Sequence, residues 1–193
     1  GPTAVDLATH AARSGVVAEP CRARPVLDVA CGQGFGSHLM VTRWGAASVH
    51  AVDVSAAALA QARALFDRPE ITWLEMDAGH LDAAAPGEPF DLIVSFETIE
   101  HLHDPAAFLR SLKALVKPGG TIVVSCPNDH WYYGPGRSKN VWHRHTYTFE
   151  EFRTLAEGIL GPATSYLVGS TAGGFANTPL ADGGGPRRRD LGG

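Results

Sequence analysis

The hydrophobic positions of this chain gather into five short segments, separated by stretches of helical or turn character. The predicted strands are residues 26–30, 47–54, 71–76, 90–96 and 121–125, of which 90–96 (FDLIVSF) is the clearest buried strand. Amphipathic or alanine-rich stretches at 36–44, 56–66 and 105–116 predict intervening helices. Strands that alternate with helices indicate βαβ units. We therefore expect an α/β fold with a mainly parallel sheet and right-handed crossovers.

Capping and terminating residues mark where several helices begin or end. Ser55 is placed to cap the second of these helices, and Pro105 suits the first turn of the third. The sequence Lys-Pro-Gly-Gly at 117–120 is expected to stop that third helix. Further along, the segment 148–151 (TFEE) matches a capping box and predicts a helix that ends near residue 157.

The pattern is less regular towards the C-terminus. A long aromatic loop containing Pro and Gly spans 126–140, and a loop of this length in a compact domain is more often functional than idle. A strand is expected at 164–168, after which the chain becomes Gly-rich. We predict one domain over residues 1–168, beginning with a short helix at 3–14, and a flexible tail over residues 169–193.

Charge and cysteine content exclude several classes of protein. The formal net charge is -4 and 19% of the residues are charged, so there is no basic excess of the kind that coats nucleic acid. Cys21, Cys31 and Cys126 form no CxxC pair, which argues against a zinc knuckle or a disulfide framework and favours a reducing cytoplasm. No apolar run approaches the roughly 20 residues of a membrane-spanning helix, so no membrane partner is expected. The sequence does not indicate an oligomeric state.

A glycine-rich turn follows the first predicted strand, in the stretch VLDVACGQGFGS at 26–37. Gly32 and Gly34 match two glycines of the dinucleotide fingerprint, but the third glycine is Gly36 rather than residue 37. With Asp28 the pattern becomes Asp-x-x-x-Gly-x-Gly-x-Gly, which resembles motif I of the class I S-adenosylmethionine-dependent methyltransferases. The resemblance implies the family's Rossmann-like fold, with a mainly parallel sheet flanked by helices, and S-adenosylmethionine as the cofactor.

The same resemblance implies how this stretch and the end of the sheet are used. Asp28, Ala30, Gly32 and Gly34 would lie near the methionine part of the cofactor, with Asp28 ordering the turn and its contacts to the amino group. The family's sheet normally includes a last antiparallel strand. The sequence offers no clear candidate for it, and residues 170–175 would be a poor version.

Two more aspartates end predicted strands, where ligands of parallel sheets bind. The resemblance implies that Asp53, followed by Val54, accepts hydrogen bonds from the ribose hydroxyls. It also implies that Asp77 binds adenine, with the Ala78 amide beside the ring, and it adds Phe96 to the cofactor-binding set. The alternatives are that Asp53 only caps the next helix and that Asp77 is a solvated loop carboxylate.

A cluster of ionisable residues, Glu97, Glu100 and His101, follows the strand FDLIVSF. These residues share one face if a helical turn starts there, and two carboxylates with an imidazole can bind a dication such as Mg, Mn, Fe(II) or Zn. The Glu-x-x-Glu-His pattern resembles the ubiquinone-biosynthesis O-methyltransferases and the enzymes that 2′-O-methylate the 3′ ends of small RNAs. The RNA branch implies a further histidine ligand, His143 here, although His145 would face the same way in an extended segment.

These patterns predict an S-adenosylmethionine-dependent methyltransferase that acts on a hydroxyl of a small molecule or sugar. Either His101 acts alone as the general base, or Glu97, Glu100, His101 and His143 hold a metal ion that lowers the pKa of the hydroxyl. Two alternatives remain open. One is a 2′-O-methyltransferase for RNA 3′ ends, which would need a basic groove, and the other is a non-catalytic cofactor-binding protein.

Overall fold

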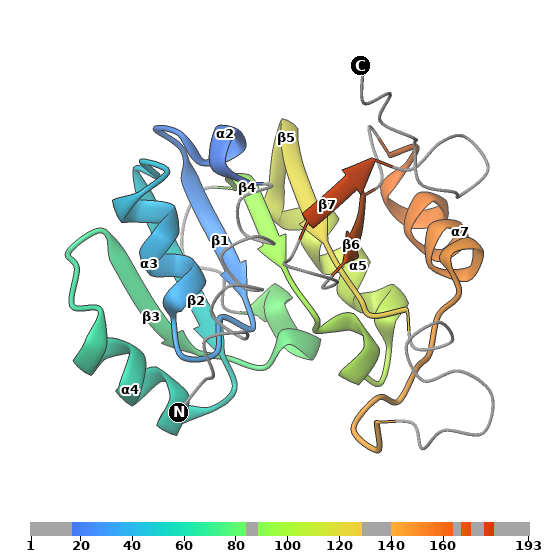
Figure 1. Cartoon of the computed structure of the whole chain (residues 1–193), viewed down its shortest axis with the longest axis horizontal. Helices are drawn as coiled ribbons and strands as arrows, with labels where there is room; N and C mark the ends of the chain where they lie inside the picture. Colours follow the sequence, from blue (N-terminus) through green and yellow to red (C-terminus); the bar gives the residue numbers. More distant parts are fainter. Residues whose placement is uncertain (1–16, 84–88, 129–139, 164–166, 171–175, 180–193) are drawn as a thin grey trace, which may run out of the picture.

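A computed structural model describes residues 17–83, 89–128, 140–163, 167–170 and 176–179. Its centre is a five-stranded sheet in the order β3-β2-β1-β4-β5, with every neighbouring pair parallel (Figure 1). The strands are β1 (Pro25–Val29), β2 (Ser48–Asp53), β3 (Ile71–Glu75), β4 (Phe90–Ser95) and β5 (Val116–Val124). The predicted parallel α/β fold is confirmed.

Two apolar layers cover the two faces of this sheet. Along β1, Val26 points into one layer and Leu27 into the other, because successive side chains of a strand face opposite ways. The first layer packs against α2 (Ala18–Cys21), α3 (Phe35–Thr42) and α4 (Ala56–Leu65). The second packs against η1 (Ala78–Ala83), η2 (Ile99–His101), α5 (Pro105–Leu115) and α7 (Phe149–Leu160) (Figure 1). The sheet is therefore buried on both sides, and its ligands must approach along an edge.

The predicted caps are present. The Ser55 hydroxyl accepts a hydrogen bond from the Ala58 amide at 3.2 Å, and Pro105 occupies the first turn of α5. Thr148 and Glu151 form the reciprocal capping box. Helix α7 continues to Leu160, three residues beyond the predicted end, because its later apolar residues pack into the layer shared with α5.

The start of β5 differs from the prediction. The sequence placed this strand at 121–125 and assigned 117–120 to a turn, whereas the strand begins at Val116, immediately after α5. A shift of register between Phe90 and Leu92 accommodates the extra residues. Gly120 fits because a Cβ there would lie 2.7 Å from Val116 Cγ2. The glycines thus permit an irregular strand where they were expected to end a helix.

The C-terminal part also departs from expectation. Strands β6 (Leu167–Ser170) and β7 (Ala176–Pro179) pair antiparallel in a two-stranded sheet that is separate from the main one. Regular structure therefore persists beyond Gly169, because an antiparallel ladder is held by backbone hydrogen bonds and needs no continuous apolar pattern. The division at 168/169 remains a prediction. The predicted helix at 3–14 and most of the segment 170–175 lie outside the described residues.

None of the described helices combines the length and the apolar character needed to cross a membrane.

Candidate functional site

Two non-glycine residues at the carboxyl edge of the sheet adopt left-handed backbone conformations. They are Ala30 after β1, with φ 59°, and Glu97 shortly after β4, with φ 52°. Such conformations cost of order 1 kcal/mol and are concentrated at functional sites. Because β1 and β4 are neighbours, both residues lie at the same edge. Because the sequence predicts cofactor binding there, we call residues 28–37, 53–55 and 77–80 the cofactor end of this edge. We call residues 96–101 and 140–147 the acceptor end, because the predicted base and metal ligands lie there.

The glycine turn is tied to the end of β2. The Cys31 amide donates to the Val52 carbonyl at 2.9 Å, and the Gly32 amide donates to Asp53 Oδ2 at 2.8 Å. Asp53 Oδ1 accepts a hydrogen bond from the Ser55 amide at 2.8 Å. Asp53 therefore organises both the turn and the start of α4. Each carboxylate oxygen retains a second lone pair for a ligand hydroxyl.

Asp28 lies beneath the glycine turn and is buried. Its Oδ2 accepts a hydrogen bond of 2.5 Å from the hydroxyl of Ser37, a buried residue in the first turn of α3. Burial raises the pKa of Asp28 to about 6, the Ser37 hydrogen bond opposes this rise, and the charge of Asp53 adds to it. Asp28 thus joins β1 to α3 and holds the turn between them. The sequence did not indicate the role of Ser37.

Gly32 and Gly34 serve different purposes, although both have positive φ. A Cβ at Gly32 would meet no heavy atom within 4 Å, so this glycine presents open backbone to a ligand. A Cβ at Gly34 would lie 2.6 Å from Trp73 Cζ3 and 2.8 Å from Ala62 Cβ. Gly34 is therefore needed for packing against β3 and α4, a requirement that the sequence pattern did not reveal.

The other predicted cofactor residues surround this turn. Val54 follows Asp53 and is 68% exposed, so its side chain is accessible at this edge. Asp77 Oδ1 accepts from the Gly79 amide at 2.8 Å, and its Oδ2 lies 3.0 Å from His80 Nδ1. Both contacts lower the pKa of Asp77, and the hydrogen bond from the Gly79 amide lowers it most. His80 is exposed and pairs with the carboxylate that is expected to bind adenine.

Two predicted residues of the cofactor set are partly or fully packed. Ala78, the first residue of η1, is buried in the second apolar layer. Phe96 is half-buried against the first layer, on the other face of the sheet. The carbonyl of Phe96 accepts a hydrogen bond from the Thr98 hydroxyl at 3.0 Å, which shapes the chain between β4 and η2. Both residues lie next to the carboxyl ends of strands, as expected from the sequence.

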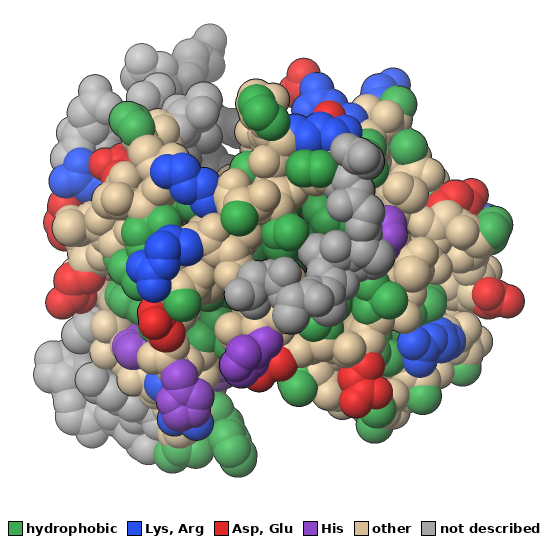
Figure 2. Space-filling view, turned by 180° about the vertical axis from the view of Figure 1, so that it is seen from behind, with side chains coloured by type: hydrophobic (Ala, Val, Ile, Leu, Met, Phe, Trp, Pro, Cys, Tyr) green, Lys and Arg blue, Asp and Glu red, His purple; other side chains and the backbone are tan. Residues whose placement is uncertain are grey.

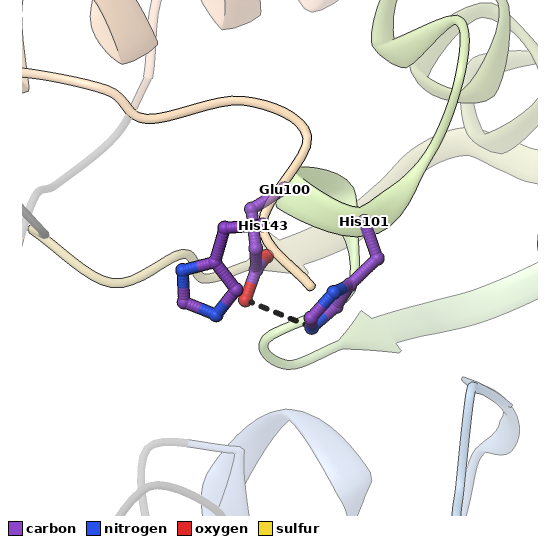
Figure 3. Close-up of side chains that lie close together, drawn as sticks. All are labelled: Glu100, His101 and His143. Atoms are coloured by element: carbon purple, nitrogen blue, oxygen red, sulfur yellow. Dashed lines mark ion pairs between the residues drawn. The ribbon is translucent and has the colours of Figure 1, made fainter. Parts of the chain in front are cut away.

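At the acceptor end, three of the four predicted metal ligands come together. Glu100, His101 and His143 each place one potential ligand atom within 4.8 Å of the others (Figure 3). Glu100 is buried, and its Oε1 lies 3.7 Å from Nε2 of the exposed His101. Glu97 is not part of this group. Its Oε1 accepts a 2.7 Å hydrogen bond from the Ser125 hydroxyl, which joins the ends of β4 and β5.

Backbone hydrogen bonds hold the segment 142–145 against η2. The Glu100 carbonyl accepts hydrogen bonds from the amides of Arg144, at 2.9 Å, and His145, at 3.1 Å. The Trp142 carbonyl lies 2.9 Å from His101 Nδ1. Since a carbonyl can only accept, His101 carries a proton on Nδ1, and in the neutral ring Nε2 keeps its lone pair. This segment thus orients the predicted general base.

The choice between the two downstream histidines follows from the same segment. The rings of His143 and His101 are 5.0 Å apart, whereas His145 stacks on Tyr147 at 5.9 Å. Burial raises the pKa of Tyr147 to about 12, with smaller contributions from Cys126 and Glu100. The structure brings His143, not His145, into the cluster. Trp131, Tyr132 and Tyr133 of the predicted functional loop lie outside the described residues.

Comparison with known proteins gives a consistent assignment. Residues 26–120 match a family model described as a methyltransferase domain. The protein named "Probable S-adenosylmethionine-dependent methyltransferase" of Mycobacterium tuberculosis strain H37Rv is 33% identical over 141 residues, 72% of this chain and 49% of that protein. The ubiquinone biosynthesis O-methyltransferase of Pseudomonas paraeruginosa is 37% identical over 107 residues, 54% of this chain and 45% of that enzyme. The chain spans about half the length of these curated relatives.

A solved structure supports the same conclusion at the level of the fold. The S-adenosylmethionine-dependent methyltransferase of Mesorhizobium loti superposes with a TM-score of 0.62 at 19% sequence identity, covering 80% of each chain. Fold, glycine turn and sequence relatives agree. The chain belongs to the class I S-adenosylmethionine-dependent methyltransferases.

Proposed function

We propose that this chain transfers the methyl group of S-adenosylmethionine to a hydroxyl of a small molecule or sugar. The observation that carries the proposal is the orientation of His101. Its Nδ1 is held by the Trp142 carbonyl at 2.9 Å, so the Nε2 lone pair is available beside the buried Glu100. An O-methyltransferase among the relatives supports a hydroxyl acceptor.

In this proposal the cofactor lies along the cofactor end. Asp28, Ala30, Gly34 and the open backbone at Gly32 surround its methionine part, with Phe96 at the neighbouring strand end. Asp53 and Val54 hold the ribose, and Asp77 and Ala78 hold the adenine. The unobstructed face of Gly32 supports this placement.

The proposed reaction is an in-line displacement. His101 Nε2 removes the hydroxyl proton as the acceptor oxygen attacks the methyl carbon, so that an O–CH₃ bond forms and the S–CH₃ bond breaks. The products are the methylated acceptor and S-adenosylhomocysteine, with the proton on His101. Glu100 Oε1, 3.7 Å from Nε2, stabilises the imidazolium that forms. Most of the remaining acceleration comes from holding the two reactants in line.

Metal assistance is the second form of this proposal. The closeness of Glu100, His101 and His143 supports a dication site, which Glu97 would have to join as the fourth predicted ligand. Such an ion would lower the pKa of the acceptor hydroxyl. The hydrogen bond between His143 Nε2 and Asn140 opposes coordination through that nitrogen, because it engages the lone pair. The mechanism above therefore relies on His101 and not on a metal.

A matched pair of histidine variants tests the function. His101→Gln should lower methyl transfer by about 10²–10⁴-fold, as expected for loss of a general base, while S-adenosylhomocysteine binding by calorimetry stays unchanged. His103→Gln, two residues away and exposed, should retain activity. The acceptor panel should include phenols, sugars and an RNA 3′ end, because affinity for RNA would fall steeply with salt. Full activity of His101→Gln would overturn the proposed base, and the absence of transfer to any acceptor would favour a non-catalytic protein.

A further inference from the structure

A turn organised by Asn140 connects the two imidazoles of the acceptor end. The Asn140 carbonyl accepts from the His143 amide at 3.1 Å, and the Asn140 side-chain oxygen accepts from the Trp142 amide at 3.0 Å. The side-chain nitrogen of Asn140 lies 2.9 Å from His143 Nε2. One asparagine thus shapes the backbone that presents the Trp142 carbonyl to His101 and also contacts the second imidazole directly.

These contacts determine the protonation pattern of His143. The Trp142 amide can only donate, so it fixes the Asn140 oxygen on its own side and directs the NH₂ group towards His143. Because that NH₂ group can only donate, His143 Nε2 must accept. In the neutral ring the proton of His143 is then on Nδ1. The Nε2 lone pair is already engaged.

The two imidazoles therefore differ in what they offer the acceptor. Both carry a proton on Nδ1, but His101 Nε2 faces Glu100 Oε1 at 3.7 Å, which is too long for a hydrogen bond, whereas His143 Nε2 is bonded to Asn140. A metal ion held by Glu100, His101 and His143 would compete with the Asn140 amide for the same lone pair. Among the residues that the structure describes, no group donates a hydrogen bond to His101 Nε2, so proton transfer to it meets no such competition.

We propose that Asn140 is a positioning residue that engages the Nε2 lone pair of His143 and so favours general-base chemistry at His101 over metal binding at the cluster. This inference rests on the proposed function, because His101 is the proposed base. The tautomer of His143 and the ion affinity are properties of the ligand-free protein, so both can be measured without methyl transfer.

Two substitutions separate the two roles of Asn140. Asn140→Asp keeps an oxygen for the Trp142 amide but replaces the donor by an acceptor, so neutral His143 should move its proton to Nε2. Asn140→Ser keeps a shorter acceptor for the Trp142 amide and has no group that reaches the His143 ring. The variant therefore removes the Asn140 donor from His143 Nε2. Gln61→Glu is the control, because it makes the same amide-to-carboxylate exchange in the exposed Gln33–Gln61 contact.

The first measurement is the tautomer of His143, from two-bond ¹H–¹⁵N correlation spectra of ¹⁵N-labelled protein. His143→Gln identifies the signals by their loss. The wild type and Gln61→Glu should show a proton on Nδ1, and Asn140→Asp a proton on Nε2. A wild-type His143 with its proton on Nε2 would overturn the proposal, whatever acceptor the enzyme proves to use.

The second measurement is the affinity for Zn²⁺ and Mn²⁺ by calorimetry in the ligand-free protein. Asn140→Ser should bind the better of the two ions about tenfold more tightly than the wild type, the value of one neutral hydrogen bond. The gain should disappear in the Asn140→Ser/His143→Gln double variant. Equal ion affinities in Asn140→Ser and the wild type, with the tautomer of His143 unchanged, would show that Asn140 does not control the ring.

Discussion

The cofactor end and the acceptor end of the sheet edge draw their residues from different kinds of structure. The cofactor end is built on strand ends and on a turn whose supporting contacts come from the sheet itself, such as the bond from the Gly32 amide to Asp53. The acceptor end is built on a short 3-10 turn and on a loop segment that joins it from 41 residues further along the chain, through His101 and Trp142. The proposed cofactor site is thus supported by the core of the fold, whereas the orientation of the proposed base, His101, depends on a few backbone carbonyls.

The largest effect should come from crowding the cofactor end. Gly34→Ala places a methyl group against Trp73 at positive φ, so overpacking and backbone strain together should lower the free energy of unfolding by about 4 kcal/mol. Gly32→Ala has the same backbone strain but open space, and should cost about 1–2 kcal/mol. Urea unfolding of both variants measures the difference. Equal losses would show that Trp73 yields readily and that the packing argument is wrong.

A pH-dependent effect should follow from the burial of Asp28. Because burial raises its pKa in the folded protein to about 6, from an ordinary value of 3.8, folded protein holds a proton that unfolded protein releases between these pH values. This contribution is complete below about pH 4 and is lost as the pH rises through about 6, amounting to about 3 kcal/mol.

The measurement compares urea unfolding of the wild type and Asp28→Asn from pH 4 to pH 7. The Asn variant lacks the ionisable group, so its stability relative to the wild type should rise by about 3 kcal/mol across this range. Asp67→Asn, at an exposed position, provides the matched control and should follow the wild type. Parallel curves for Asp28→Asn and the wild type would contradict the assignment of this slope to Asp28.

A somewhat smaller effect is expected on cofactor affinity. Asp53→Ala removes an acceptor for the ribose hydroxyls and for the Gly32 amide, and should weaken S-adenosylhomocysteine binding by about 30-fold, or roughly 2 kcal/mol. Calorimetry measures the affinity directly. The tautomer of His101 should not change, since its partner is at the acceptor end. Unchanged affinity would remove Asp53 from the ribose site.

The smallest effect should arise beyond the acceptor end. Thr148→Ala removes the capping box that starts α7 directly after the segment 142–147, and should cost about 1 kcal/mol of unfolding free energy. Because the contacts of residues 142–145 to Glu100 are made by the backbone, the His101 tautomer should persist. If this variant altered the tautomer, the acceptor end would depend on α7 more strongly than its hydrogen bonds indicate.

The same contrast explains how much the sequence could predict. The five strands, Ser55 and the capping box at Thr148 were predicted because short-range patterns determine them. The early start of β5 was missed, since it depends on a register shift against Phe90. Of the pair β6–β7, only a strand near the first was predicted, because pairing through the backbone leaves a weak sequence pattern.

Site residues follow the same division. Asp28 was predicted from its spacing to the glycine turn, and Asp53 and Asp77 from their places at the ends of predicted strands. Ser37, Trp73 and Asn140 were not, because each acts through a contact whose partner is distant or ordinary in sequence. Glu97 shows the reverse case: its spacing suggested a fourth ligand, while its side chain accepts a hydrogen bond from Ser125 across the ends of two strands.

The Glu100 carbonyl accepts hydrogen bonds from the successive amides of Arg144 and His145. The neighbouring His101 ring donates a hydrogen bond to the Trp142 carbonyl. Lifting the segment 142–145 away from η2 breaks all three hydrogen bonds in one movement. The orientation of His101, the proposed base, is therefore coupled to the contact of this segment with η2. On the face shown in Figure 2, histidine side chains lie close to hydrophobic ones. Val141 and Trp142, which follow Asn140 in this segment, are 85% and 76% exposed.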